Sequence, residues 1–283
     1  MSYIRDDVSA KRKVGMVLTY VILIIFAILA IAPLLWLAMN SFKTSQDYQM
    51  NRLGLPRRFF WQNYTQAWVR GNFGIFIINS IIYTSVTTVS ILVLSFMSGF
   101  AFSKISNRAT KWMYGSYVVG ILMTLQSIMI PLFIVINQVG LYDTKLGVLI
   151  PYIGIGLPMG IYLATEFMKS IPNALVESAR LDGAHYGRIF ISIMTPMAAP
   201  VGVTIAILQI SGTWNEFMLI NMLTSSTKNK SLPVGIQSFA GALSTDYGKL
   251  FASLMIGLIP MLVFYIIFRK EITKGVSAGA VKG

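Results

Sequence analysis

Six long stretches of this chain contain no charged side chain, and this pattern restricts the possible folds more than any other feature. Together the six stretches hold 159 of the 283 residues, and the shortest of them has 19. About 20 helical residues cross the roughly 30 Å hydrocarbon core of a bilayer. The pattern therefore predicts an all-α membrane protein with six transmembrane helices. The charge-free stretches are 14–42, 71–103, 112–142, 146–165, 189–215 and 250–268.

The composition agrees with this prediction and excludes an ordinary soluble domain. Charged residues make up 12% of the chain, about half of the roughly 25% typical of soluble proteins. The charge that remains is positive, with 23 Lys and Arg residues against 10 Asp and Glu. A nucleic-acid-binding domain would need a polar surface to present such an excess. We therefore expect the chain to lie in a lipid bilayer and to bind no nucleic acid.

The chain is expected to form a single transmembrane domain, 1–283, because it contains no linker and no internal repeat. The predicted spans are about 14–39, 73–102, 112–137, 146–168, 196–221 and 250–268. The polar segments between and beside them are an arm at 1–13, a loop at 169–195, a second loop at 223–249 and a tail at 269–283.

The distribution of Lys and Arg predicts the orientation of the chain. An even number of spans puts both termini on one side, and cytoplasmic segments carry an excess of these residues. With the termini inside, the inner segments hold 14 of the 23 Lys and Arg residues, including Lys11, Arg12 and Lys13 beside the first span. We expect a multi-pass protein of the cytoplasmic membrane with both termini in the cytoplasm.

The inner loop 169–195 has the pattern of two short helices joined by a sharp turn. Asn173 follows Pro172 and is a suitable helix cap, and residues 174–181 favour a helix. Gly183 permits the turn that follows. On spacing alone, an ordinary solvated loop between two spans is the favoured explanation of this segment.

The same loop resembles the EAA loop in the membrane subunits of binding-protein-dependent ABC importers, most closely the MalG-like subunits of carbohydrate importers. It departs from the family pattern at Ser178, where Ala is usual, and at Thr195, where Leu is usual. The matching positions are Glu177, Ala179, Asp182, Gly183, Ala184, Phe190, Ile193, Pro196 and Pro200. Further similar segments are Asn79-Ser80, Ile130-Pro131-Leu132 through Gly140-Leu141, Trp214-Asn215-Glu216-Phe217, Leu232-Pro233-Val234-Gly235 and the tail Gly275 to Gly283.

The resemblance implies a permease subunit that forms half of the channel of an ATP-driven importer for a sugar or oligosaccharide. Its implied partners are a second homologous permease subunit, two ABC ATPase subunits and an extracellular or periplasmic solute-binding protein. The sequence has no G-x-x-x-x-G-K-[ST] loop for ATP phosphates. We therefore expect no enzymatic activity and no bound cofactor in this chain, with ATP and Mg²⁺ used by the partner ATPase.

The resemblance also implies the residues that couple the permease to its ATPase. Family members dock the two short helices into a groove of the ATPase, where Gly183 would allow the turn and Glu177 would pair with a basic residue. The family also places the tail against the ATPase, although a disordered basic tail would fit the same sequence. The expected coupling residues are Glu177, Ala179, Asp182, Gly183, Ala184, Val281 and Lys282.

The outer loop 223–249 resembles the family's scoop loop, which reaches into the external binding protein. An ordinary connector would have the same length and polarity. The expected contacts to the binding protein are Gly235, Gln237, Ser238 and Gly241.

Glu166 and Glu216 are carboxylates within predicted spans, where such a group is by default a functional candidate. Glu166 lies near the inner end of its span and is expected at the membrane surface, so the stronger candidate is Glu216. Glu216 stands about one turn from the outer end of its own span, so a half-solvated position at the membrane surface is the competing explanation. Gln209, Trp214 and Asn215 lie in the same region, and amide and aromatic groups suit sugars. These four residues are the predicted substrate pathway.

Three other functions are conceivable for a chain with six spans. A stand-alone secondary transporter would need an ion site near the bilayer midplane, whereas the carboxylates within the predicted spans lie toward the ends. A membrane enzyme lacks a recognisable catalytic motif in this sequence. An ABC permease for a solute other than a sugar would share all of the features above.

Overall fold

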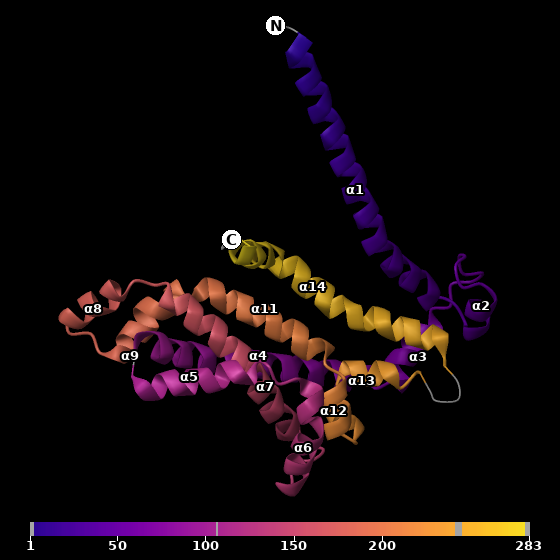
Figure 1. Cartoon of the computed structure of the whole chain (residues 1–283). Helices are drawn as coiled ribbons and strands as arrows, with labels where there is room; N and C mark the ends of the chain where they lie inside the picture. The colour runs from indigo at the N-terminus through magenta and orange to yellow at the C-terminus, as the bar shows by residue number, and fades with distance from the viewer. Residues whose placement is uncertain (1–2, 106, 241–244, 281–283) are drawn as a thin grey trace. The chain divides into compact units, whose positions relative to one another are not determined.

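The computed structural model describes residues 3–105, 107–240 and 245–280, with side chains omitted for 3–14, 70 and 271–280. The regular secondary structure of these residues is helical, apart from one isolated antiparallel bridge between Ala240 and Thr245 (Figure 1). The predicted all-α class is thus confirmed. The chain divides into two compact units, Met1–Arg70 with Phe239–Ile256, and Gly71–Ser238 with Gly257–Gly283.

The first unit contains the long helix α1 and several short elements. Its helices are α1 (Tyr3–Ser41), α2 (Ser45–Met50), α3 (Gln62–Arg70) and the beginning of α14 (Tyr247–Ala280), which continues into the second unit. The side chains of α1 between residues 15 and 35 are exposed all round, as expected for an apolar helix that meets lipid or another subunit. Aromatic rings of Trp36, Tyr48 and Phe251 pack edge to face at the other end of the helix.

The second unit is built around three packed helices, α4 (Phe73–Lys104), α7 (Lys145–Lys169) and α11 (Ala199–Asn215). Small residues allow α4 and α7 to approach closely: a Cβ atom added at Gly99 would lie 2.8 Å from the Cβ of Ala164. Gly156 and Gly160 continue the stripe of small residues along α7, against α4. Membrane helices associate through such stripes, because lipid supplies no hydrophobic driving force for their contact.

Two of the candidate spans in the structure are bent pairs of helices, and the second of them begins inside the predicted loop 169–195. The helices α5 (Arg108–Gly120) and α6 (Leu125–Gln138) meet at 105°, and the stretch Tyr186–Met197 meets α11 at 73°. The second bend lies at Ala198, between Pro196 and Pro200, and proline disrupts continuous helical hydrogen bonding. Among the described residues, four helices are long and apolar enough to cross a membrane, or up to six if each bent pair counts as one span.

The predicted span 196–221 is also interrupted near its end, where Glu216 adopts an extended backbone with ψ 128°. The short helices that follow are α12 (Met218–Leu223), η2 (Thr227–Asn229) and α13 (Leu232–Gln237). The predicted loop 169–195 contains α8 (Asn173–Leu181), α9 (Tyr186–Ile189), the π-helix η1 (Phe190–Met194) and the start of α10 (Thr195–Met197).

Candidate functional site

A sharp turn at Gly183 joins α8 to α9. The Gly183 N–H donates to the carbonyl of Arg180 over 3.0 Å, and the Ala184 N–H donates to the carbonyl of Ala179 over 2.9 Å. This pair of bonds, with Gly183 at φ 81°, is a Schellman motif. A Cβ atom at Gly183 would meet nothing within 4 Å. Glycine is therefore required by the backbone angle and not by a lack of space.

The inward face of this helix pair is anchored in an apolar cluster. Val176, Ala179 and Ile189 are buried in it, and the half-buried Ala184 packs against it. The cluster also contains residues of α4, α7, η1 and α11, namely Phe100, Ala164, Met168, Met194 and Val201. Of the predicted coupling residues, Ala179 therefore belongs to the anchor. We call residues 173–189, comprising α8, the turn and α9, the Gly183 knob.

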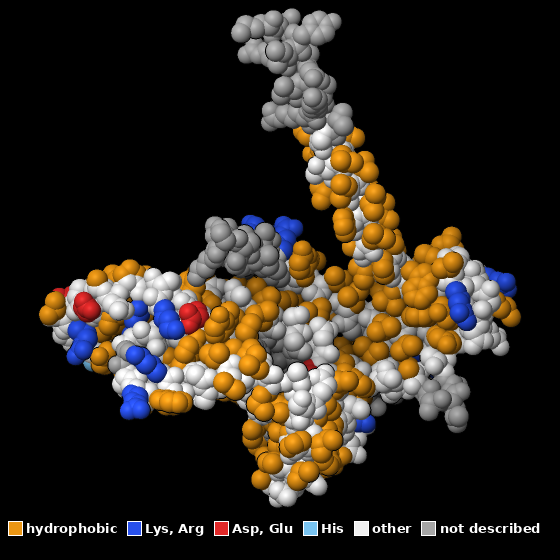
Figure 2. Space-filling view, viewed as in Figure 1, with side chains coloured by type: hydrophobic (Ala, Val, Ile, Leu, Met, Phe, Trp, Pro, Cys, Tyr) orange, Lys and Arg blue, Asp and Glu red, His pale blue; other side chains and the backbone are white. Residues whose placement is uncertain are grey.

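The outward face of the Gly183 knob combines acidic, basic and apolar side chains, with Arg180 and Arg188 also exposed. Glu177 and Asp182 are exposed, and Leu181 is 90% exposed. Many charged side chains gather over the end of this unit that carries α8 and α9 (Figure 2). Sequence reasoning did not single out Leu181, because a leucine in an apolar-rich chain carries no signal by itself. Leu181 is thus exposed between the charged side chains of Arg180 and Asp182 on the outward face of the knob.

Lys104, at the end of α4, ties that helix to the Gly183 knob. Its Nζ donates to the carbonyl of Ile171 over 2.6 Å and to Oδ1 of Asn173 over 2.8 Å. The sequence indicated for Lys104 only a place among the basic residues of the inner segments, and it did not predict this link. Val281 and Lys282, the other predicted coupling residues, lie outside the described residues.

A second polar assembly is organised by Asp143, close to the start of α7. Its Oδ1 accepts from the backbone N–H of Ser225 over 3.0 Å, the N–H of Ser226 over 3.1 Å and the Ser226 hydroxyl over 2.9 Å. Asn229 donates to both the carbonyl and the carboxylate of Asp143. Burial alone would raise the pKa of Asp143, but these hydrogen bonds outweigh it and lower the pKa to about 2.

The first turns of α4 hold the same segment from the other side. The Asn79 amide donates to the carbonyl oxygens of Lys228 and Lys230 over 2.8 Å and 2.9 Å. The Ser80 hydroxyl accepts from the N–H of Leu232 over 2.9 Å, and the Tyr83 hydroxyl donates to the carbonyl of Asn229 over 2.8 Å. We call Asn79, Ser80, Tyr83, Asp143 and the segment 223–232 the Asp143 clasp.

The clasp gives physical roles to two motifs of the sequence, Asn79-Ser80 and the stretch that begins at Leu232. Gly235, a predicted contact for a binding protein, is buried, and the ring of Phe76 leaves no room for a Cβ atom at this position. Gln237 and Ser238 are exposed. Gly241 lies outside the described residues.

Glu216 caps a helix. Its Oε1 accepts from the N–H of Leu219 over 2.7 Å, and its Oε2 accepts from the N–H of Ile220 over 3.1 Å and from the Tyr152 hydroxyl over 2.6 Å. A carboxylate at the start of α12 accepts hydrogen bonds from N–H groups that would otherwise be unpaired, and its negative charge interacts favourably with the helix dipole.

The other predicted pathway residues have different environments. Trp214 is buried, whereas Asn215 is exposed and donates to the carbonyl of Ser211 over 2.9 Å. Gln209 is half-buried and reaches the carbonyl of Gly156 over 3.5 Å. The four residues therefore do not share one environment, and their proposed role in the pathway stays a prediction.

Comparison with known proteins places this chain in a family. Residues 91–269 match the family described as "Binding-protein-dependent transport system inner membrane component". The chain belongs to this family. The predicted resemblance to ABC importer permeases is thereby confirmed, and the matched region includes the whole Gly183 knob and the part of the Asp143 clasp that follows α4.

Similar proteins extend over nearly the full length of this permease. It is 32% identical to the multiple sugar-binding transport system permease protein MsmG of Streptococcus mutans, over 96% of this chain and 99% of that one. It is 32% identical to the trehalose transport system permease protein SugB of Mycobacterium tuberculosis, over 90% and 93%. The fold is similar to a chain in the crystal structure of a bacterial ABC transporter that imports alginate, with a TM-score of 0.79 at 24% identity, covering 91% of this chain and 96% of that one.

Proposed function

We propose that this permease forms half of the membrane channel of an ABC importer for a sugar or oligosaccharide. An external binding protein delivers the solute, and two separate ATPase subunits hydrolyse ATP. The observation that carries the proposal is the Gly183 knob, a rigid exposed element rooted among the packed helices of a chain from this family. The sugar cargo is supported by relatives named for trehalose and for multiple sugars.

The Gly183 knob would transmit the motion of the ATPases to the membrane helices. Its exposed face, with Glu177, Leu181 and Asp182, would contact the ATPase. Its buried face shares one apolar cluster with α4, α7 and α11. Because a packed cluster moves as a body and does not deform continuously, displacement of the knob would displace these helices.

The Asp143 clasp would act at the opposite end of α4. It fixes the base of the predicted scoop loop 223–249, from which Gln237 and Ser238 project. In this arrangement the six predicted spans lie in the cytoplasmic membrane with both termini inside, and the knob faces the cytoplasm. A second, homologous permease subunit would complete the channel.

The test is to reconstitute the chain in proteoliposomes with its partner permease, ATPases and binding protein. The proposal predicts sugar uptake that requires ATP, with hydrolysis stimulated by the sugar-loaded binding protein. The chain incorporated alone serves as the matched control and is expected to transport nothing. Ion-driven uptake by the chain alone would establish a secondary transporter instead. Uptake restricted to solutes other than sugars would contradict the cargo and leave the ABC assembly standing.

A further inference from the structure

Residues 42–72 connect α1 to α4, and both of these helices are long and apolar enough to cross a membrane. A segment joined to a span at each end lies close to a membrane surface. Within it, residues 43–58, called here the Lys43 loop, contain one short helix, α2, and an irregular stretch. The structure of this loop shows which of its groups face inward and which face outward.

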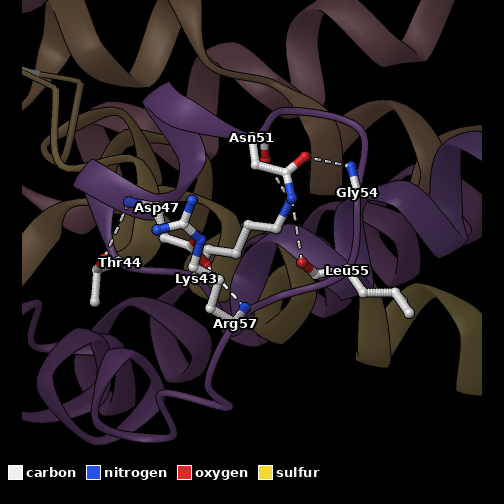
Figure 3. A network of polar contacts seen from close by, with 7 residues as sticks. All are labelled: Lys43, Thr44, Asp47, Asn51, Gly54, Leu55 and Arg57. Carbon is white, nitrogen blue, oxygen red and sulfur yellow. Dashed lines mark hydrogen bonds and ion pairs between the residues drawn. The ribbon is translucent and has the colours of Figure 1, made fainter.

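The interior of the Lys43 loop is polar (Figure 3). The Lys43 side chain is fully buried, and its Nζ donates to the carbonyl of Asn51 over 2.7 Å. Burial lowers the pKa of Lys43, and the nearby carboxylate of Asp47 opposes that effect. The side chain of Asn51 accepts from the N–H of Gly54 over 2.7 Å and donates to the carbonyl of Leu55. The backbone polar groups of the turn are thus satisfied from within the loop.

Further bonds fix the loop at its start and its end. The N–H of Arg57 donates to Oδ2 of Asp47 over 3.3 Å, and the Thr44 hydroxyl caps α2. The indole N–H of Trp36, on α1, donates to the carbonyl of Arg52 over 2.9 Å. The loop is therefore held by these polar bonds and by the packing of the Tyr48 ring against Trp36 and Phe251. Its exposed apolar side chains, Met50, Leu53 and Leu55, take no part in this framework.

Those apolar side chains point outward, as Leu55 does in Figure 3. The exposed fractions are 75% for Met50, 81% for Leu53 and 73% for Leu55. Phe59 and Trp61, both also exposed, pack against the ring of Phe42 at 5.5 Å and 4.6 Å between centroids. A fixed loop with satisfied polar groups and outward apolar tips is built to meet an apolar surface.

The charges of the segment indicate what that surface is. Within the Lys43 loop, residues 43–58, the three arginines Arg52, Arg57 and Arg58 and the buried Lys43 accompany a single acidic residue, Asp47. Aromatic rings together with arginines at the end of a span are typical of the headgroup layer of a bilayer. Basic residues within a Debye length of a bilayer surface, here the outer one in the predicted orientation, are attracted to its anionic lipid headgroups.

We propose that the Lys43 loop is a lipid-binding element that inserts Met50, Leu53 and Leu55 into the boundary between headgroups and acyl chains. The leaflet is the one in which α1 ends at Ser41. Arg52 and Arg58 contact the phosphates of anionic headgroups, while Lys43 stays inside and holds the loop in shape. The element anchors the connection between the two spans at a fixed depth, whichever solute the transporter carries.

The test places a fluorescent probe at the tip of the loop in the complete importer. Because the chain has no cysteine, Leu53→Cys supplies a unique labelling site in a complex with cysteine-free partners. The labelled importer is placed in nanodiscs of equal parts phosphatidylcholine and phosphatidylglycerol that contain nitroxide-labelled lipid. The matched control is Thr227→Cys, an exposed position on η2. We expect several-fold stronger quenching at position 53 than at position 227, together with a blue-shifted emission.

Two further conditions test whether the loop requires anionic lipid, and one addition tests whether it is a surface for the binding protein. In pure phosphatidylcholine, or in Arg52→Gln with Arg58→Gln, quenching at position 53 should fall toward the level of position 227. Unchanged quenching in both conditions would overturn the headgroup contact. Quenching at position 53 no stronger than at position 227 would overturn insertion. If the binding protein then shifted the emission of position 53, the loop would be a surface for that protein.

Discussion

The Gly183 knob and the Asp143 clasp lie toward opposite ends of α4, and they are held in different ways. The knob consists of helices that satisfy their own backbone, and apolar contacts of Val176, Ala179 and Ile189 attach it to the core. The clasp holds a segment with little regular structure through side chains that bond to its backbone groups. Apolar attachment lets an element move as a rigid body, whereas the clasp depends on individual hydrogen bonds.

This contrast predicts different sensitivities. Buried N–H and carbonyl groups in the 223–232 segment need partners, and Asn79 and Asp143 supply them. Loss of one such side chain leaves several groups unpaired at once. By contrast, a change of charge on the exposed face of the knob should leave the folding of the knob intact. The same change should weaken the contact between the knob and a partner.

The largest effect is expected for Gly183→Val. A β-branched residue at φ 81° is strained, and the left-handed conformation alone costs about 1–2 kcal/mol for ordinary residues. The turn should distort and misplace α8 relative to α9. We expect sugar uptake by the reconstituted importer to fall roughly tenfold or more. Gly154→Ala is the control, since a Cβ atom there meets nothing within 4 Å; equal uptake in the two variants would contradict the role of the turn.

Asp143→Ala should locally loosen the clasp. Removal of the Asp143 carboxylate leaves the N–H groups of Ser225 and Ser226 without their acceptor. An unpaired buried group of this kind destabilises a structure by about 1–3 kcal/mol. Hydrogen exchange at these amides should accelerate, while exchange in α8 stays unchanged. Asp143→Asn keeps one acceptor oxygen and should show a smaller acceleration. Unaltered exchange in both variants would show that other contacts hold the segment.

Lys104→Met should weaken the link between α4 and the knob. Two bonds from its ammonium group, to Ile171 and Asn173, are lost, and such charged hydrogen bonds contribute about 1.5–3 kcal/mol when well formed. We expect less sugar transported per ATP hydrolysed, with the complex still assembled. Lys111→Met, an exposed lysine on α5, is the control and should leave that ratio unchanged. If both variants behave alike, the link plays no part in coupling.

The smallest effect is a pH dependence confined to the clasp. The folded pKa of Asp143 is about 2, below the ordinary value of 3.8. The carboxylate therefore stabilises the clasp fully above pH 3.8, and this contribution is lost as the pH falls toward 2. As the pH falls from 3.8 to about 2, amide hydrogen exchange at Ser225 and Ser226 should become faster than the intrinsic pH dependence of exchange alone would make it. Asp143→Asn should remove that excess, and exchange in the knob should not show it.

The sequence predicted local features better than long-range ones. The charge-free stretches predicted an all-α chain, and Gly183 predicted a turn, because both signals lie within one element or one turn. The clasp joins Asn79 to carbonyls about 150 positions later in the chain, which no local pattern encodes. The bends at 121–124 and at Ala198 also escaped prediction, since an apolar run does not show where its helix breaks.

Glu216 illustrates a different limit. A carboxylate in an apolar stretch has the same sequence signature whether it lines a pathway or caps a helix. Only the positions of Tyr152, Leu219 and Ile220 around it reveal the cap. Small residues present a similar problem, because the packing role of Gly160 on α7 depends on the facing Ser95 of α4.

The central claim, that the Gly183 knob couples ATP hydrolysis to transport, is tested most directly by Glu177→Ala. ATP hydrolysis and sugar uptake are measured on the same proteoliposomes, with Ser178→Ala as the exposed neighbouring control. We predict an assembled complex that hydrolyses ATP while uptake is lost in Glu177→Ala and retained in Ser178→Ala. Normal uptake by Glu177→Ala, at the same ratio of sugar to ATP as the unmodified importer, would contradict the claim.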